Sequence, residues 1–153
     1  MALFLVQHGI ATPKDQDPEQ GLTPEGIADV KRIADVARNY SVKPSKILHS
    51  GKTRAKQTAK LIAEALDPEG GVAPRNGLDP NDDPAALIRY LDPAENLMIV
   101  GHLPFLERLA SLLTCGDANK LVFKFQKGGI VCLDREPETH GWFIKWALMP
   151  HIS

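Results

Sequence analysis

The chain has 153 residues, of which 43% are hydrophobic, and its 18 lysines and arginines nearly balance 19 aspartates and glutamates. This length favours a single domain over residues 1–153, able to bury about 70% of the surface that the unfolded chain exposes. The formal net charge of −1 argues against a protein that binds nucleic acid or an anionic membrane surface.

No segment has the features of a targeting signal or a membrane span. The apolar residues 1–6 are few and lack the basic flank of a signal peptide. No apolar run approaches the roughly 18 residues that a membrane-spanning helix needs. Cys115 and Cys132 are isolated, so they indicate neither a disulfide framework nor a CxxC motif. We therefore expect a cytoplasmic protein without a membrane partner.

The first predicted elements are a buried strand and an amphipathic helix. Residues 2–6 are a short continuous apolar run, typical of a strand that is buried on both faces. Thr23 and Pro24 suit the N-cap and the first position of a helix. Apolar residues then recur at helical spacing, which predicts that this helix continues to about Tyr40.

A second strand and helix follow. Residues 46–49 are predicted to form the strand, and Ser50 is a candidate N-cap for the helix. The segment 67–71, Asp-Pro-Glu-Gly-Gly, is expected to end that helix. Residues 72–73 are a weak extended piece.

The remaining elements change from alternating helices and strands to strands alone. Asp83 and Pro84 are expected to open a short helix that reaches Leu91. Residues 96–100 are another continuous apolar strand, and a helix is predicted over 105–113. The tail contains three strand-like pieces, at 121–125, 130–133 and 142–146.

This order of elements predicts an α/β fold. Strands that alternate with helices form a mostly parallel central sheet with helices on both faces, a three-layer α/β/α arrangement. The C-terminal strands are expected to extend the sheet antiparallel.

Chemically useful residues follow three of the predicted parallel strands. They are Gln7-His8-Gly9, the segment from Ser50 to Arg54, and Gly101-His102. Ligands of open parallel sheets bind beyond the carboxyl ends of the strands. Two histidines and an arginine are therefore expected to converge on one crevice, with Arg54 one turn into its helix.

Such a convergence suits phosphoryl transfer. The reaction needs cationic or N–H donors on the phosphoryl oxygens and a nucleophile in line with the leaving group. A ring nitrogen of His8 can be that nucleophile, and Gly9 lets the backbone approach the phosphate closely. Arg54 and His102 can bind the oxygens. Each of these residues alone also fits an ordinary turn, cap or helix position, so the interpretation depends on their joint placement.

At these residues the sequence resembles the histidine phosphatase superfamily, whose fold is phosphoglycerate-mutase-like, and within it the short bacterial phosphohistidine phosphatases. The resemblance spans nearly the whole chain. It is carried by Gln7-His8-Gly9, by Leu22-Thr23-Pro24-Glu25-Gly26, by the segment from Ser50 to Ala59 (SGKTRAKQTA), and by Gly101-His102-Leu103-Pro104.

The resemblance implies that His8 is the phosphorylated nucleophile and that Arg54 and His102 hold the phosphoryl oxygens, together with Gln7 and Gly9. Gln7 stands where the family's opening motif has arginine. Glutamine donates N–H bonds but supplies neither charge nor a bidentate fork. Its presence leaves a phosphate-binding module with little turnover as an alternative.

Two carboxylates are candidates for a general acid. Asp79 and Asp82 lie in the loop before the short helix, whereas Asp83 is better explained as the N-cap of that helix. An alcohol leaving group needs such an acid more than an imidazole leaving group does. His49, near the same crevice, is expected to pack in the second strand.

The expected activity is that of a metal-independent phosphatase. No HxH or HExxH motif occurs, so we expect no metal or other cofactor. Only a short segment separates Leu66 from Leu97, and the resulting open crevice favours phosphohistidine on a protein as substrate. The alternative substrate is a small phosphorylated molecule, handled by a phosphomonoesterase at the same site.

Overall fold

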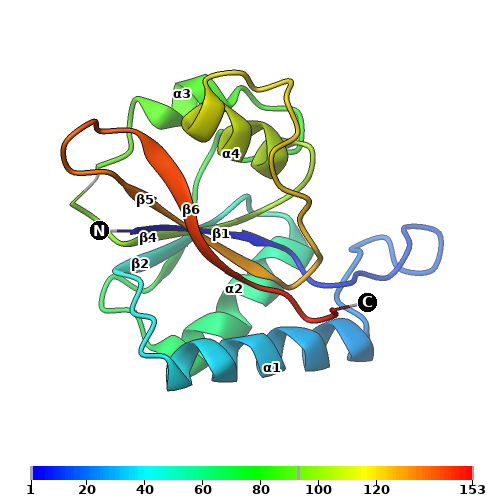
Figure 1. The fold of residues 1–153 in the computed structure, drawn as a ribbon. Helices are drawn as coiled ribbons and strands as arrows, with labels where there is room; N and C mark the ends of the chain where they lie inside the picture. Colours follow the sequence, from blue (N-terminus) through cyan, green and yellow to red (C-terminus); the bar gives the residue numbers. More distant parts are fainter. Residues whose placement is uncertain (1, 93, 153) are drawn as a thin grey trace.

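The computed structural model describes residues 2–92 and 94–152, which form one mixed sheet with helices on both faces (Figure 1). The strands and helices are, in chain order, β1 (Ala2–Gln7), α1 (Pro24–Asn39), β2 (Lys46–His49), α2 (Thr53–Leu66), β3 (Val72–Pro74), α3 (Pro84–Ile88), β4 (Leu97–Gly101), α4 (Phe105–Cys115), β5 (Ile130–Arg135) and β6 (Trp142–Leu148). None of the helices in the described ranges is long and apolar enough to cross a membrane.

The strand order explains why the predicted crevice forms. The sheet runs β3-β2-β4-β1-β5-β6. The pairs β3–β2, β2–β4 and β4–β1 are parallel, whereas β5 and β6 are antiparallel to their neighbours. This arrangement confirms the prediction of a mostly parallel sheet extended by antiparallel C-terminal strands. The carboxyl ends of β2, β4 and β1 are therefore adjacent at the same edge of the sheet.

The alternation of side chains along the strands divides the core into two layers. Phe4 and Val6 of β1 pack on the side of α1 and α2, whereas Leu3 and Leu5 pack on the side of α3 and α4. Figure 1 shows these two pairs of helices on opposite faces of the sheet. Both faces of β1 are buried, which is why its sequence is a continuous apolar run.

The loop after β1 is held tightly against the start of α1. The Thr23 side chain accepts a hydrogen bond from the Gly26 amide at 3.0 Å, and Pro24 occupies the first turn, as expected for this helix start. A Cβ atom on Gly26 would lie 2.2 Å from the carbonyl oxygen of Ile10, and one on Gly9 2.9 Å from Val30. Backbone atoms therefore exclude a side chain at Gly26, whereas a side chain at Gly9 would require Val30 to shift.

The predicted start of the second helix was wrong. Helix α2 begins at Thr53, and its N-cap is Lys52, which makes no side-chain cap bond. Ser50 lies before the helix, in the loop after β2, where its hydroxyl is within hydrogen-bonding distance of His102. Arg54 is consequently the second residue of the helix, in its first turn rather than one turn further along.

The strand expected at 121–125 was also wrong. Residues 121–126 are in no strand of the sheet, and β5, which pairs Val6 with Ile130, is the strand beside β1. Phe123 and Phe125 instead contact each other edge to face, with ring centroids 5.4 Å apart. Both pack into the core on the α4 side.

Candidate active site

The residues singled out after β1, β2 and β4 meet at the carboxyl edge of the sheet. Strand β4 lies between β2 and β1, and the register pairs His49 with Val100 and Gln7 with Gly101. The next residues of these strands, His8, Ser50 and His102, are therefore neighbours although they come from distant parts of the chain.

His8 is oriented by the backbone. Its ring is buried, and Nδ1 lies 2.7 Å from the carbonyl oxygen of Gly9. Because a carbonyl can only accept, Nδ1 carries the proton and Nε2 of the neutral ring keeps its lone pair. The backbone beside it is also fixed, since the Gly9 amide donates to Thr58 Oγ1 at 3.0 Å.

The surroundings of His8 keep its ring neutral. Burial is the largest influence and lowers the pKa of His8 from 6.5 to about 4, although the hydrogen bond to Gly9 acts in the opposite direction. The positive charges of Arg54 and Lys127 lower this pKa further. At neutral pH the Nε2 atom is thus available as a nucleophile.

His102 lies next to His8. The two ring centroids are 5.1 Å apart, and the rings are inclined by 50°. Nε2 of His102 lies 2.6 Å from the Ser50 hydroxyl, and Nδ1 is buried without a hydrogen-bond partner among the described residues. Burial, followed by the charges of His8, Arg54 and Lys52, lowers the pKa of His102 to about 3. At neutral pH this ring is therefore also uncharged, so it can act on an anion only through an N–H of the neutral imidazole and not as a cation.

Arg54 supplies the positive charge of the site. It lies at the start of α2, half-buried, and no carboxylate within the described ranges forms an ion pair with it. Its charge lowers the pKa values of both His8 and His102. An unneutralised guanidinium beside a helix N-terminus is suited to an anion with several oxygens.

Gln7 occupies the last position of β1 and is buried, with 6% of its surface exposed. Its backbone carbonyl accepts a hydrogen bond from the Gly128 amide at 2.9 Å. Its side-chain oxygen Oε1 is buried and has no partner among the residues described. The carboxamide has hydrogen-bonding groups but no charge.

The carboxylates proposed as general acids lie in a turn near this edge. The Asp82 carboxylate accepts a hydrogen bond from the Asp79 amide at 2.8 Å, so it organises the turn. Asp83 accepts from the Ala85 amide at 3.0 Å and caps α3, as its sequence position indicates. The loop begins close to the site, because the carbonyl of Leu78 lies 3.8 Å from the position of a Cβ on Gly101.

His49 has a local structural contact. It is buried, and its Nδ1 accepts a hydrogen bond from the Gly51 amide at 3.0 Å. This bond shapes the turn that carries Ser50 into the crevice. Burial is the main reason that the pKa of His49 is lowered, with smaller contributions from Lys56 and Lys60.

Two polar contacts that support the site were missed in the sequence. Gln57 Oε1 accepts a hydrogen bond from the Leu22 amide at 2.7 Å, and Thr58 Oγ1 accepts one from the Gly9 amide. Both residues lie one turn after Arg54 in α2. The available signal was their position, three and four residues after Arg54 on the same helix face.

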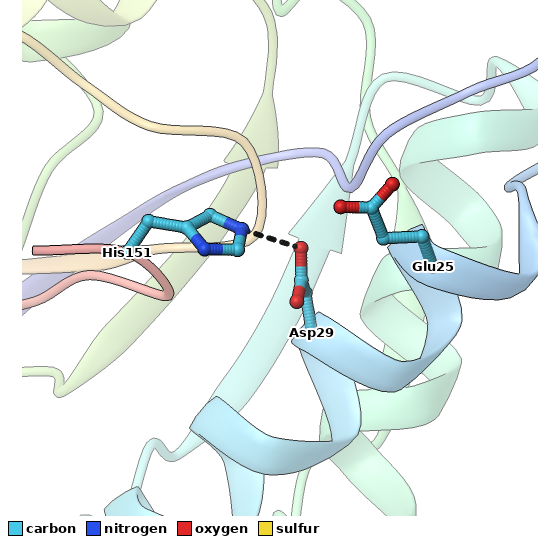
Figure 2. Close-up of side chains that lie close together, drawn as sticks. All are labelled: Glu25, Asp29 and His151. Atoms are coloured by element: carbon cyan, nitrogen blue, oxygen red, sulfur yellow. Dashed lines mark hydrogen bonds and ion pairs between the residues drawn. The ribbon is translucent and has the colours of Figure 1, made fainter. Parts of the chain in front are cut away.

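One further cluster contains metal-ligand residue types. Figure 2 shows Glu25 and Asp29 projecting from α1 toward His151 of the C-terminal tail. The Asp29 carboxylate already has two partners, His151 Nε2 at 3.1 Å and Arg32 Nη2 at 3.0 Å. These contacts account for the cluster as a structural junction between α1 and the C-terminal tail.

The family assignment follows from sequence comparison. The model of the histidine phosphatase superfamily (branch 1) matches residues 3–79, which include β1 with His8, and α2 with Arg54. The chain belongs to this superfamily. This membership supports phosphatase activity.

Individual relatives agree with the assignment. An uncharacterized protein of Picosynechococcus sp. (strain PCC 7002) is 31% identical over 142 residues, covering 87% of this chain and 84% of the relative. Phosphohistidine phosphatase SixA of Escherichia coli K12 is 23% identical over 156 residues, covering 98% and 94%.

Solved structures show the same fold. The protein histidine phosphatase SixA in complex with tungstate matches with a TM-score of 0.84 at 22% identity, covering 98% of this chain and 97% of that one. A putative α-ribazole-5′-P phosphatase of Escherichia coli K-12 matches with a TM-score of 0.77 at 17% identity, covering 100% and 99%. The fold is accordingly phosphoglycerate-mutase-like.

Proposed function

We propose that the protein is a metal-independent phosphatase in which His8 forms a covalent phosphohistidine intermediate. The observation that carries this proposal is the pair of buried neutral rings 5.1 Å apart, one of which keeps a lone pair on Nε2 because its Nδ1 donates to the Gly9 carbonyl. Nucleophilic catalysis by an oriented imidazole divides one difficult displacement into two easier ones.

In the first step the lone pair of His8 Nε2 attacks phosphorus. A P–N bond forms as the bond from phosphorus to the leaving group breaks, and the leaving group departs with the electron pair and takes up a proton. In the second step water attacks the phosphorus and gives up a proton. The P–N bond then breaks, which releases inorganic phosphate and restores the neutral imidazole.

The oxygens of the transferred phosphoryl group need donors throughout both steps. We assign Arg54 to this role as the cation, with His102 and the carboxamide of Gln7 as neutral donors. Gly9 keeps the backbone beside His8 free of a side chain, and the contact with Thr58 keeps that backbone in place. Lys127 and Lys52 add a positive potential that attracts a phosphorylated substrate.

Phosphohistidine on a protein is the substrate that we favour. Between β3 and β4 the chain has only the five-residue helix α3, so no long insertion covers the site and a protein surface can approach it. Exchange of phosphate between two imidazoles is nearly balanced and depends little on an acid. For a phosphoester, Asp79 or Asp82 is the candidate donor to the leaving oxygen. The similarity to the phosphohistidine phosphatase SixA supports this choice.

The central test is whether phosphate becomes attached to His8. Rapid acid-free quenching during turnover should trap a phosphoprotein whose phosphate is stable to base and labile to acid. His8→Asn should abolish the label and lower the rate by more than about 10³-fold. His140→Asn is a matched control, because His140 is exposed and its positive φ of 61° is tolerated by asparagine. An unchanged rate in His8→Asn would refute the mechanism.

Gln7 motivates the second candidate, a phosphate-binding module with little turnover. Its buried carboxamide replaces a charged donor, and its Oε1 has no partner within the described residues. Tight binding of phosphate or tungstate without detectable phosphoenzyme would favour this candidate. A measurable burst of phosphoenzyme would count against it.

A further inference from the structure

We infer that Ser50 is a positioning residue for His102: its hydroxyl donates to Nε2 and so fixes the ring proton on Nδ1, the nitrogen that then donates to a phosphoryl oxygen. The catalytic consequence rests on the function proposed above. The protonation pattern itself does not, and it can be measured in the resting protein.

The contact is a product of the sheet register. Ser50 follows β2 directly and His102 follows β4 directly, and these strands are hydrogen-bonded neighbours with His49 opposite Val100. The distance of 2.6 Å from Ser50 Oγ to His102 Nε2 is in the short part of the range for a side-chain hydrogen bond. Ser50 lies before the N-cap of α2, which is Lys52, so its hydroxyl is not committed to the first amides of the helix.

The contacts of the hydroxyl favour one direction of the bond. The Lys52 amide lies 3.3 Å from Ser50 Oγ and can only donate to it. The hydroxyl proton has no other acceptor than Nε2 of His102 among the described residues, so we assign the hydroxyl as the donor to this nitrogen. A neutral imidazole has one proton, and with Nε2 accepting, that proton is on Nδ1.

The second nitrogen of His102 is the feature that points to a ligand. Nδ1 is buried in a side chain that is only 2% exposed, and it has no partner among the described residues. A buried N–H without an acceptor is unfavourable, and native proteins keep such groups mainly where function requires them. An oxygen of a phosphoryl group on His8, whose ring centroid is 5.1 Å away, would supply the missing acceptor.

The opposite tautomer would have a different consequence. If Nε2 donated to Ser50, Nδ1 would keep a buried lone pair, which repels a phosphoryl oxygen instead of binding it. The histidine would then contribute no hydrogen bond through Nδ1. The two possibilities differ in a directly observable property, namely which ring nitrogen is protonated.

The test uses the full chain with ¹⁵N-labelled histidine. Long-range ¹H–¹⁵N correlation spectra at neutral pH distinguish protonated from unprotonated ring nitrogens. We expect His102 to have its proton on Nδ1 in the wild type and to become a mixture of tautomers in Ser50→Ala. Ser50→Thr keeps the hydroxyl and should restore the single tautomer. A proton on Nε2 in the wild type, or no change in Ser50→Ala, would overturn the inference.

Activity provides the second readout. Ser50→Ala should lower kcat about 10- to 100-fold with a smaller change in KM, because the ring that it orients acts in the transition state. Ser50→Thr should recover most of this loss. Ser45→Ala is the matched control, since it removes an exposed hydroxyl at the start of the same strand, bonded only to the Asn96 carbonyl.

The two readouts separate this inference from the proposed function. If the wild type forms no phosphoenzyme but shows the Ser50-dependent tautomer, and inorganic phosphate shifts the His102 Nδ1 resonance, the inference stands and the hydrolase proposal fails. If phosphoenzyme forms while Ser50→Ala changes neither tautomer nor kcat, the hydrolase proposal stands and the positioning role fails.

Discussion

Two regions of this molecule place histidine beside charged side chains, and they are organised in opposite ways. In the crevice, His8 and His102 are buried, and the charges that act on them are the cations Arg54, Lys52 and Lys127. At the junction of α1 with the tail, His151 is half-exposed and faces a carboxylate, Asp29, whose side chain is only 5% exposed.

The difference separates a reactive arrangement from a structural one. In the crevice, burial and positive charge keep the rings neutral, and Arg54 has no ion-pair partner in the part described, so it is available to bind an anion. At the tail junction the Asp29 carboxylate already has two partners, Arg32 and His151. Figure 1 shows the tail that follows β6 beside the N-terminal end of α1, where His151 contacts Asp29.

Among changes to the charged side chains of these two regions, the largest effect is expected from removing the unpaired cation. Arg54→Ala should lower kcat/KM by about 10²- to 10³-fold, because it removes the charged donors to the phosphoryl oxygens. Arg32→Ala, which removes a cation already paired with Asp29, should leave kcat/KM within about threefold of wild type. Steady-state kinetics on both variants measure the contrast. Equal losses in the two variants would show that the crevice cation has no special role.

A charge can also be added to the crevice. A charge-assisted hydrogen bond contributes about 1.5–3 kcal/mol, so Gln7→Arg should raise kcat/KM by roughly one to two powers of ten on phosphohistidine and phosphoester substrates. Gln7→Met, similar in size but without hydrogen-bonding groups, separates the effect of charge from that of volume. No gain in the arginine variant would mean that the carboxamide is already an adequate donor.

The neutral rings predict how stability depends on pH. The pKa values of about 4 for His8 and about 3 for His102 lie below the ordinary value of 6.5. As the pH falls below 6.5, the unfolded chain binds protons at these positions while the folded protein does not, so the free energy of unfolding decreases. The stabilisation is therefore complete above that pH and is lost toward the folded pKa values.

Urea denaturation at a series of pH values measures this dependence. His102→Asn should show a shallower loss of stability on acidification than the wild type, and His140→Asn should retain the wild-type slope. An identical slope in His102→Asn would contradict the argument that burial keeps this ring neutral.

The smallest effect is expected at the tail junction. His151→Ala removes a half-exposed partner of Asp29 and should lower the free energy of unfolding by at most about 1 kcal/mol. Phosphate binding, measured by calorimetry, should not change, because the contact stabilises the tail and not the crevice. A clear loss of phosphate affinity would show that the two regions are coupled.

Local patterns were sufficient to predict most of the fold. Continuous apolar runs specified β1 and β4, since burial on both faces leaves no position for polar residues. Thr23 with Pro24 and Asp83 with Pro84 located helix starts, because capping is a short-range interaction. The rule that parallel strands place their ligands at the carboxyl edge brought His8, Arg54 and His102 into one expected region.

The remaining features were decided by the tertiary structure, because they depend on contacts between residues that are far apart in the chain. Ser50 has the chemistry of a helix cap, but the register of β2 with β4 offers its hydroxyl the ring of His102, 52 residues away. Residues 121–125 have the composition of a strand, but they lie outside the sheet, and their two phenylalanines pack against each other and against the α4 side of the core. Asp29 and His151 are 122 residues apart, and no local pattern relates them. Such contacts depend on which groups the completed fold brings within hydrogen-bonding distance, and that outcome is a property of the whole chain.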